Sequence, residues 1–430
     1  MLFSTAGTCM IVPTWSVSDS STIASAELRT FRKYPDQSAP AADFLDWKRT
    51  MSSSVPKRIG RYDLVTPMLP CKDEILQRFE RFLMSGQYIL GEEVRLLEEK
   101  LAEECGVPAA VGVASGSSAL FLALSVAGVR PGDEVITTPY TFDATMEAII
   151  LLDAVPVFVD IKPQDLNLDS GLLADAITPK TRAFLPVPIF GAPCDMDPIM
   201  AVAAEHGIQV IADMAQAWGT FYDGRPIGSY ARMSTLSFYP TKNLPGIGDG
   251  GMIFCRSAED AELIRRIRGH LPVRMNGHLY TGWNSRLDEV QAMVIRIRRE
   301  RFAAEQADRD KVAEIYDGYI PATNRLQTPN GGRGMKVTYH QYWVRCRNRD
   351  DLRMLLDREG IDTGVYYDPP LHHHELAVYC RTSGSMAEAE RAGREVLTLP
   401  IHAALPFADA HRIGALVGQF LEQEAASTSA

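Results

Sequence analysis

The sequence predicts an α/β protein, with a large domain built on a mostly parallel sheet and a smaller α+β domain at the C-terminal end. Between residues 109 and 213, short apolar runs alternate with helical segments. The short runs are rich in β-branched residues and lack polar alternation, which is typical of strands buried on both faces. A long charged amphipathic segment then precedes a shorter mixed region. This order of elements indicates a parallel sheet covered by helices, followed by a second domain.

The composition excludes several classes of protein. Of the 430 residues, 46% are hydrophobic and 23% are charged, which is ordinary for a globular chain. The net charge of −10 argues against a general binder of nucleic acid or anionic membranes, and no apolar stretch is as long as a membrane span. The seven cysteines are scattered and never form a C-x-x-C pair. They indicate reduced thiols and therefore a cytoplasmic protein.

The chain divides by sequence into four parts. Residues 1–57 show weak periodicity and are rich in small and polar residues, so we expect a disordered leader. Within it, Met51 opens an alternative start. Residues 58–285 are expected to form the large domain, residues 286–323 a bridging helix, and residues 324–424 the small domain.

The elements follow one another in a regular order. Apolar residues recur at helical spacing in 72–84 and 92–104. Beyond them the strands and helices alternate as AAVGVA, SSALFLALSVAG, DEVITT, TFDATMEAIILL, VPVFVD, RAFLPVPIF, DPIMAVAAEHG and IQVIAD. In the small domain we expect the strand KVTYHQYWVRC, the helix DDLRMLLDREG and the extended segment IDTGVYY. Ligands of parallel sheets gather at the carboxyl ends of the strands, so residues there are candidates for a site.

Two candidate segments follow predicted strands. In VASGSSALFLAL the strand should end at Ala114 and a helix should open at Ser117 or Ser118. Such a helix start can bind an anion, although an ordinary serine cap is the simpler interpretation of this segment alone. In IQVIADMAQAWG, Asp213 follows a buried run, where a carboxylate is costly unless a cation pairs with it. Asp213 could bind a metal, cap a helix or hold a protonated ring nitrogen.

Lys242 lies in STLSFYPTKNLPGIGDGG, between a short β-like run and a glycine-rich loop that allows close backbone approach. Taken alone, it is most simply a solvated loop lysine. However, an anion cradle, the carboxylate of Asp213 and this lysine follow one another along the chain. Pyridoxal phosphate (PLP) needs this set: a lysine for a Schiff base, a carboxylate for the pyridinium nitrogen and a cradle for the phosphate. We therefore expect Lys242 to carry PLP and to move the proton once it is released.

Six motifs point to a known family. SGSSAL, PYTFDAT, IADMAQAWG, SFYPTKNLPGIGDGG, GWNSRLDEVQA and GVYYDPPLH occur in this order between residues 61 and 417. They resemble the DegT-type family of PLP-dependent sugar aminotransferases, which have the aspartate-aminotransferase fold (PLP fold type I). The resemblance implies that Lys242 is the Schiff-base lysine and that Asp213 is the partner of the ring nitrogen. It also implies a homodimer with shared active sites.

The resemblance assigns roles to further residues. Gln216 is expected near the phenolic oxygen of the cofactor, and Phe142 is expected to stack on its ring. Apart from the resemblance, we also expect Tyr239 and His340 to contact the substrate. The phosphate is expected to be held by Ser117, the Ser118 amide, Ser237 and Asn284 of the other subunit.

The sequence departs from the family pattern at three positions. Ala212 stands where an acidic residue is usual, Pro188 where a histidine is common, and Asp368 where a proline is common. None of the three concerns the Schiff-base chemistry, but Pro188 and Asp368 leave the substrate contacts open.

The resemblance implies a two-step transamination, in which an amino acid, glutamate, aminates the cofactor and the cofactor aminates a nucleotide-linked keto sugar. The GDGG after the lysine is similar to the subgroup that aminates carbon 3, whereas carbon-4 enzymes more often have GEGG. Alternatives that stay open are a 4-keto sugar, a cyclitol or an amino-aromatic precursor as acceptor, and a non-catalytic regulator that kept the fold. A sugar dehydratase of the same fold is disfavoured, because those enzymes replace the lysine with histidine and Lys242 is present.

One further cluster of potential ligands is His372, His373 and His374. Because sequence neighbours do not readily converge on one ion, we interpret the triplet as a loop at the edge of the small domain. No metal is expected.

Overall fold

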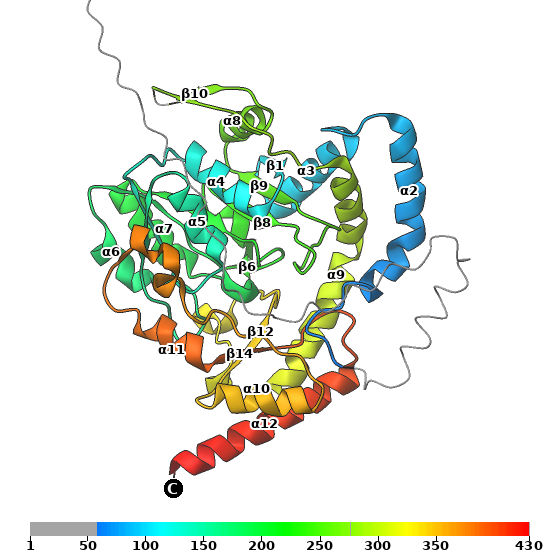
Figure 1. Ribbon diagram of the computed structural model, residues 1–430, viewed down its shortest axis with the longest axis vertical. Helices are drawn as coiled ribbons and strands as arrows, with labels where there is room; N and C mark the ends of the chain where they lie inside the picture. The colour runs from blue at the N-terminus through cyan, green and yellow to red at the C-terminus, as the bar shows by residue number, and fades with distance from the viewer. Residues whose placement is uncertain (1–57, 276, 430) are drawn as a thin grey trace, which may run out of the picture. The chain divides into compact units, whose positions relative to one another are not determined.

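The computed structural model describes residues 58–275 and 277–429 (Figure 1). The leader expected for residues 1–57 lies outside these described residues. An eight-stranded sheet forms the centre, in the order β1-β9-β8-β5-β4-β2-β3-β13. Strand β9 runs antiparallel to β1 and β8, and all other neighbours in the sheet are parallel, which confirms the predicted fold class. The strands are β1 (Ala109–Val113), β2 (Glu134–Thr137), β3 (Val155–Phe158), β4 (Thr181–Phe184), β5 (Gln209–Asp213), β8 (Met233–Ser237), β9 (Gly251–Cys255) and β13 (Arg381–Thr382).

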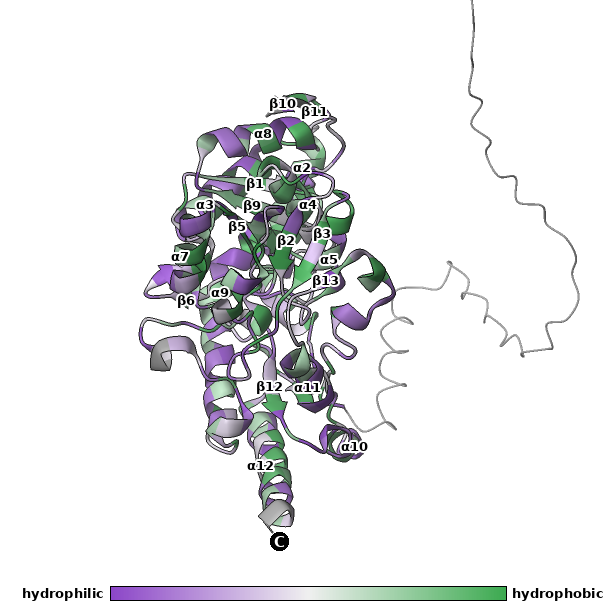
Figure 2. Ribbon diagram, turned by 90° about the vertical axis from the view of Figure 1, so that its left-hand side faces the viewer, coloured by the Kyte–Doolittle hydropathy of each residue, from purple (hydrophilic) through white to green (hydrophobic). Residues whose placement is uncertain are grey.

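The strands are apolar on both sides because helices cover both faces of the sheet. Strand β5 illustrates this: Val210 and Ala212 pack into one hydrophobic cluster, and Ile211 packs into another. Successive side chains of a strand point to opposite faces, so a strand buried on both sides needs an unbroken apolar run. In Figure 2 the central strand β2 is coloured as a hydrophobic segment.

Two sets of helices provide these covers. The cluster that contains Val210 also takes side chains from α3 (Glu92–Cys105), α6 (Leu173–Ala176) and α7 (Met196–His206). The cluster that contains Ile211 takes them from α4 (Gly116–Val126), α5 (Asp143–Ile150) and α8 (Ala258–Arg268). The site described below lies on the second side, at the carboxyl ends of β5 and β8.

Helix α9 (Glu289–Asp317) links the sheet to a second core. Ile295 in its first half packs into the cluster of α3 and α7, whereas Val312 and Tyr316 pack with the C-terminal elements. Those elements include β12 (Tyr342–Arg345), which pairs antiparallel with β14 (Val396–Leu399). The accompanying helices are α10 (Arg349–Arg358), α11 (Ala387–Glu395) and α12 (Phe407–Ser429). The domain borders at residues 285 and 323 stay a prediction, because residues 57–430 form one compact unit.

One connection was not expected from the sequence. Strand β13 comes from the C-terminal region but adds to the edge of the large sheet, parallel to β3. It contains only two residues, Arg381 and Thr382, and so carries no periodic signal.

The smaller elements connect these layers. They are α2 (Lys72–Ser85), β6 (Phe221–Tyr222), β7 (Arg225–Pro226), β10 (Val273–Met275), β11 (His278–Tyr280) and the 3-10 turns η1 (Thr66–Cys71), η2 (Ser170–Leu172), η3 (Ile189–Gly191), η4 (Ile227–Ser229), η5 (Ala322–Asn324), η6 (Pro329–Gly332), η7 (Leu371–His373) and η8 (Glu375–Tyr379). Among the described residues, none of the helices combines the length and apolar character that crossing a bilayer requires.

Candidate active site

A cavity of about 430 Å³ opens at the carboxyl ends of β5 and β8. This is where the parallel topology places ligands. Most residues predicted from the sequence line it: Ser117, Phe142, Asp213, Gln216, Ser237, Tyr239, Lys242 and His340. The structure therefore brings together residues that lie up to 223 positions apart in the chain.

Asp213 is the last residue of β5, and the alternation of the strand turns its side chain to the face of Ile211, towards α5. Only 5% of the residue is exposed. Its carboxylate accepts a hydrogen bond of 2.8 Å from Thr145 Oγ1 and one of 3.2 Å from the amide of Ala215. Burial raises the pKa of Asp213, and the two hydrogen bonds and the charge of Lys242 oppose this rise. A cation placed against this carboxylate would relieve the cost of burying it.

Lys242 follows β8 in a tight turn, in which its amide donates to the carbonyl of Tyr239 at 2.8 Å. Loss of solvent around the ammonium lowers the pKa of Lys242 to about 8, and the negative charge of Asp213 limits the drop. An amine with such a pKa is a nucleophile and a proton carrier close to neutral pH.

The helix start at the cavity differs in detail from the prediction. Helix α4 begins at Gly116 and its cap is Ser115, because the Ser115 Oγ accepts the amide of Ser118 at 3.1 Å. The sequence prediction opened the helix at Ser117 or Ser118, one or two residues too late. Ser118 does not line the cavity, whereas the exposed Ser117 does. The Ser118 amide expected at the phosphate is thus already used within the cap.

Glycines allow the helix start and the strand end to meet. A Cβ on Gly116 would lie 2.8 Å from the Cβ of Ser237, and one on Gly251 would lie 2.3 Å from the carbonyl oxygen of Ser115. Any larger residue would push the two apart. The N-terminus of α4 therefore lies at the cavity between the hydroxyls of Ser117 and Ser237. Such a helix N-terminus is a suitable binding site for a phosphate.

Aromatic rings line the same cavity. Phe142 occupies the cap position of α5 and is 57% exposed, and Tyr239 is 52% exposed. Apolar rings that face an open cavity can cover the face of a planar ligand.

Two polar side chains are held in fixed orientations. Gln216 Oε1 accepts the amide of Phe190 at 2.9 Å, and its Nε2 donates to the Tyr367 hydroxyl at 3.1 Å. His340 Nδ1 lies 3.2 Å from Asn243 Oδ1. Burial and the neighbouring Lys242 lower the pKa of His340, so its imidazole stays neutral at pH 7.

Sequence reasoning missed part of the wall. Tyr62, Gln341, Tyr366 and Tyr367 also line the cavity. The Tyr62 hydroxyl accepts a hydrogen bond of 2.6 Å from Gln341 and lies 3.3 Å from the Tyr366 hydroxyl. Two of these tyrosines belong to GVYYDPPLH, so the motif was a usable signal. Nothing in the sequence near Tyr62 indicated that it reaches the site.

The remaining predicted positions lie outside the cavity. Asn284 is exposed and is not among the lining residues. Asp368 pairs with Arg349 at 3.1 Å, and Ala212, a residue of β5, is completely buried in the core.

The arrangement fits PLP on three counts: a lysine with a lowered pKa, a buried carboxylate in need of a cation, and a hydroxyl-flanked helix start. Their place at the carboxyl edge of a mostly parallel sheet defines the class of the protein as an enzyme of PLP fold type I. In agreement, residues 70–417 match the model of the DegT/DnrJ/EryC1/StrS aminotransferase family. The chain belongs to this family, and it is an aminotransferase by that membership.

Relatives support the assignment. The chain is 40% identical to a "Pleiotropic regulatory protein" of Geobacillus stearothermophilus over 77% of this chain and 90% of that protein. It is 39% identical to a UDP-2-acetamido-2-deoxy-3-oxo-D-glucuronate aminotransferase of Pseudomonas aeruginosa over 79% of this chain and 94% of that protein. Among solved structures, DesV of S. venezuelae in complex with a ketimine intermediate matches with a TM-score of 0.79 and 37% identity, covering 85% of this chain and 99% of that one.

Proposed function

We propose that the protein transfers an amino group from glutamate to a nucleotide-linked 3-keto sugar, with PLP bound through Lys242. The observation that carries this proposal is that Lys242 and Asp213 face one cavity together with the start of α4. Burial shifts the pKa of both groups towards the uncharged form, and the charge of each group opposes the shift in the other. This is the pair of groups that PLP chemistry needs on opposite ends of the cofactor.

Each part of the cavity has a binding role in this proposal. Ser117, Ser237 and the start of α4 would hold the phosphate, and Asp213 would keep the ring nitrogen protonated. Phe142 would cover the ring, and Gln216 would lie at its phenolic oxygen, oriented by its bonds to Phe190 and Tyr367. When bound, the cofactor supplies a carbonyl carbon that takes up the amino group and a ring that accepts electrons.

The chain itself supplies the proton transfer. Lys242 Nζ has a pKa of about 8 and can accept and return a proton near neutral pH. The neutral, buried His340 and the exposed Tyr239, which both line the cavity, would hydrogen-bond to substrate hydroxyls. Tyr62 and Gln341, which are hydrogen-bonded to each other, add further polar groups to the wall of the cavity.

The experiment tests attachment and turnover separately. Borohydride reduction of the PLP-loaded protein followed by peptide mass spectrometry should find the pyridoxyl group on Lys242. Glutamate added to the loaded protein should then release one 2-oxoglutarate per chain. A pyridoxyl group on another lysine would overturn the role of Lys242, and failure to release 2-oxoglutarate would favour the regulator that the Geobacillus relative's name describes.

The 3-keto sugar as acceptor is supported by GDGG after the lysine and by the name of the Pseudomonas relative, a 3-oxo sugar aminotransferase. A 4-keto sugar or a cyclitol is the alternative acceptor. Incubating the aminated cofactor form of the protein with matched 3-keto and 4-keto nucleotide sugars decides between them. Faster amination of the 4-keto sugar would overturn the proposed position.

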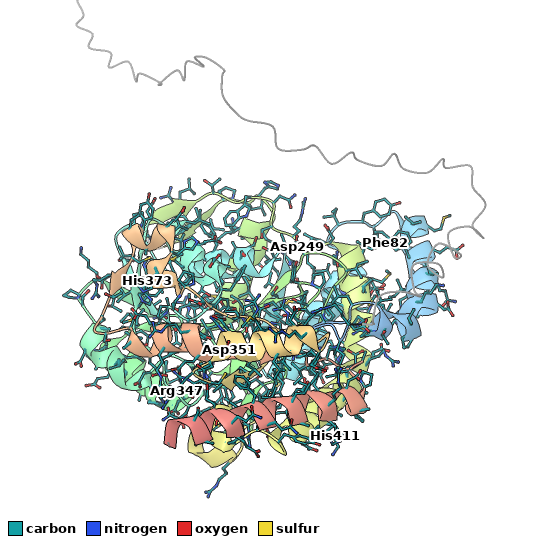
Figure 3. The ribbon with its side chains drawn as sticks, turned by 60° about the horizontal axis from the view of Figure 1, so that its bottom comes forward. Phe82, Asp249, Arg347, Asp351, His373 and His411 are labelled. Carbon is teal, nitrogen blue, oxygen red and sulfur yellow. The ribbon has the colours of Figure 1, made fainter. Side chains whose placement is uncertain are left out.

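We also propose a homodimer with shared sites, because α2 lacks buried residues and exposes an apolar face. Figure 3 labels Phe82 on this helix, whose ring packs against Tyr88 at 5.1 Å. Exposed apolar patches of this kind mark contacts between proteins. On α2 and the segment that follows it, the large apolar side chains that are at least 38% exposed are Leu76, Phe79, Leu83, Met84, Tyr88, Ile89 and Leu90.

The dimer is tested by placing charges on this face. Leu76→Glu combined with Leu83→Glu should shift the sedimentation coefficient to that of a monomer, while Glu80→Gln on the same helix should not. A dimer that survives both charges would show that the interface lies elsewhere.

A cytoplasmic location is proposed as well, because each of the six described cysteines is free.

A further inference from the structure

Two adjacent histidines converge on one carboxylate oxygen at the edge of the large sheet. Nε2 of His372 lies 3.3 Å from Oε1 of Glu390, and Nε2 of His373 lies 3.2 Å from the same atom. The two imidazole rings are 4.1 Å apart at their centroids. In the described part of the chain, this is the one group of three such side chains whose ligand atoms all lie within 4.8 Å of one another.

The backbone explains why sequence neighbours converge here. The turn η7 is anchored by the buried Leu371, whose amide donates to the carbonyl of Pro139 at 2.9 Å. Opposite it, the first turn of α11 is fixed by Asp160, whose two carboxylate oxygens each accept a backbone amide at 2.8 Å. The ring planes of the two histidines are tilted by only 42°, so both nitrogens can face Glu390. The two sequence neighbours therefore approach one carboxylate oxygen, which the sequence did not lead us to expect.

The distances fit metal ligation as well as long hydrogen bonds. Tetrahedral Zn²⁺ with bonds of about 2.0–2.1 Å places neighbouring ligand atoms about 3.3–3.4 Å apart. A charge-assisted hydrogen bond between an imidazolium and a carboxylate would be shorter, about 2.7–2.9 Å. The observed separations of 3.3 and 3.2 Å lie close to the edges of a coordination tetrahedron.

We propose that His372, His373 and Glu390 form a binding site for a divalent ion of the Zn²⁺ type. Two imidazoles and a carboxylate are a ligand set that zinc accepts, with a fourth position for water. The ion has a path from solvent, because the side chains of His373 and Glu390 are 52% and 37% exposed, and Figure 3 shows His373 at the outer surface. Arg394 lies 4.0 Å from the other carboxylate oxygen, so Oε1 remains available.

Such an ion would act as a clamp. Glu390 on α11 follows His373 by 17 positions and His372 by 18 positions. The turn η8 and the edge strand β13 lie between these ligands in the sequence. The chain enters this segment directly from Tyr366 and Tyr367, which line the active-site cavity. Binding would therefore hold one edge of the sheet and the end of the segment that forms the cavity wall. It is independent of the proposed transamination.

The test uses tag-free holoenzyme, freed of metals with a chelator and titrated with Zn²⁺ by calorimetry. One ion should bind per chain, the melting temperature should rise with Zn²⁺, and Co²⁺ should give the visible absorption of a four-coordinate site. His373→Ala and Glu390→Gln should each weaken binding at least tenfold. His374→Ala is the matched control, because it removes the neighbouring imidazole that is not in the group, and it should bind as the wild type does.

Circular dichroism verifies that each variant is folded, and His373→Gln replaces His373→Ala if that variant is not. Absence of a stoichiometric site in the wild type would overturn the proposal. Binding that is unchanged in both His373→Ala and Glu390→Gln would equally overturn it, because the ion would then sit elsewhere, for example on the cofactor.

Discussion

The hydroxyl of Thr145 donates a 2.8 Å hydrogen bond to Oδ2 of Asp213, across 68 positions of the chain. Both side chains are buried. The bond stabilises the charged form of a carboxylate that burial would otherwise neutralise. Thr145 was not expected at the site, yet it determines how much negative charge Asp213 presents to the cavity.

Thr145→Val keeps the shape of the side chain and removes this donor. A hydrogen bond to a charged group is worth about 1.5–3 kcal/mol, so the rate of glutamate deamination by the loaded protein should fall roughly 10- to 100-fold. Stopped-flow absorbance of the half-reaction measures this rate. Thr145→Ser retains the hydroxyl and should recover most of it. A wild-type rate in Thr145→Val would show that Asp213 stays charged without the bond.

The pKa of Lys242 makes cofactor loading pH-dependent. Below about pH 8 Lys242 is an ammonium, and above it a nucleophilic amine. The rate at which PLP attaches to the cofactor-free protein should therefore rise about tenfold per pH unit up to this point and then level off. Timed borohydride quenching and mass spectrometry measure the rate.

Asp213→Asn provides the control for that pH profile. The charge of Asp213 raises the pKa of Lys242, so its removal should move the midpoint of loading to lower pH. A midpoint that stays in place would mean that the two groups do not interact. Lys242→Ala should show no attachment at any pH.

Glu289 is a structural carboxylate that is not among the residues lining the cavity. It accepts the amides of Gly91, Glu93 and Val94 at 2.7, 3.0 and 3.1 Å and thereby caps the start of α3. Only 2% of Glu289 is exposed. Glu289→Gln should lower the free energy of unfolding by about 1.5–3 kcal/mol, because a neutral amide replaces a charged acceptor.

Urea unfolding measures the loss for Glu289→Gln, with activity per folded molecule unchanged. Glu92→Gln is the matched control on the helix that Glu289 caps, because this side chain is 73% exposed, and it should alter stability by less than about 0.5 kcal/mol. Equal losses in the two variants would refute the capping role.

Asn284 tests whether two chains share each site. It is exposed and outside the cavity of its own chain, and we expect it to reach the phosphate of the partner. In a heterodimer of Lys242→Ala and Asn284→Ala chains, a trans contact puts both defects into one site and leaves the other intact. Activity at limiting PLP should then be about half that of the wild type, by the two-fold symmetry of such dimers. Activity no better than half that of the Asn284→Ala homodimer, with native mass spectrometry confirming the mixture, would rule out the trans contact.

Several elements were predictable because their signal is local. The apolar run around Val210 predicted a buried strand, and the motif around Lys242 predicted the lysine before a glycine-rich loop. The cap of α4 was misplaced because Ser115, Ser117 and Ser118 are chemically alike. Only the hydrogen bond from the Ser118 amide identifies Ser115 as the cap. The two-residue strand β13 was missed because such a short segment has no period to detect.

The sequence by itself determined the alternation of strands and helices, the family, and the order in which Asp213 and Lys242 meet the carboxyl edge of the sheet. These follow from side-chain periodicity and from motifs of adjacent residues. Only the tertiary structure decided that Thr145 bonds to Asp213, that Arg61 and Tyr62 reach Tyr366 across more than 300 positions, and that His372 and His373 face Glu390. The physical reason is that such contacts depend on how distant segments pack, and side-chain hydrogen bonds leave no pattern along the chain.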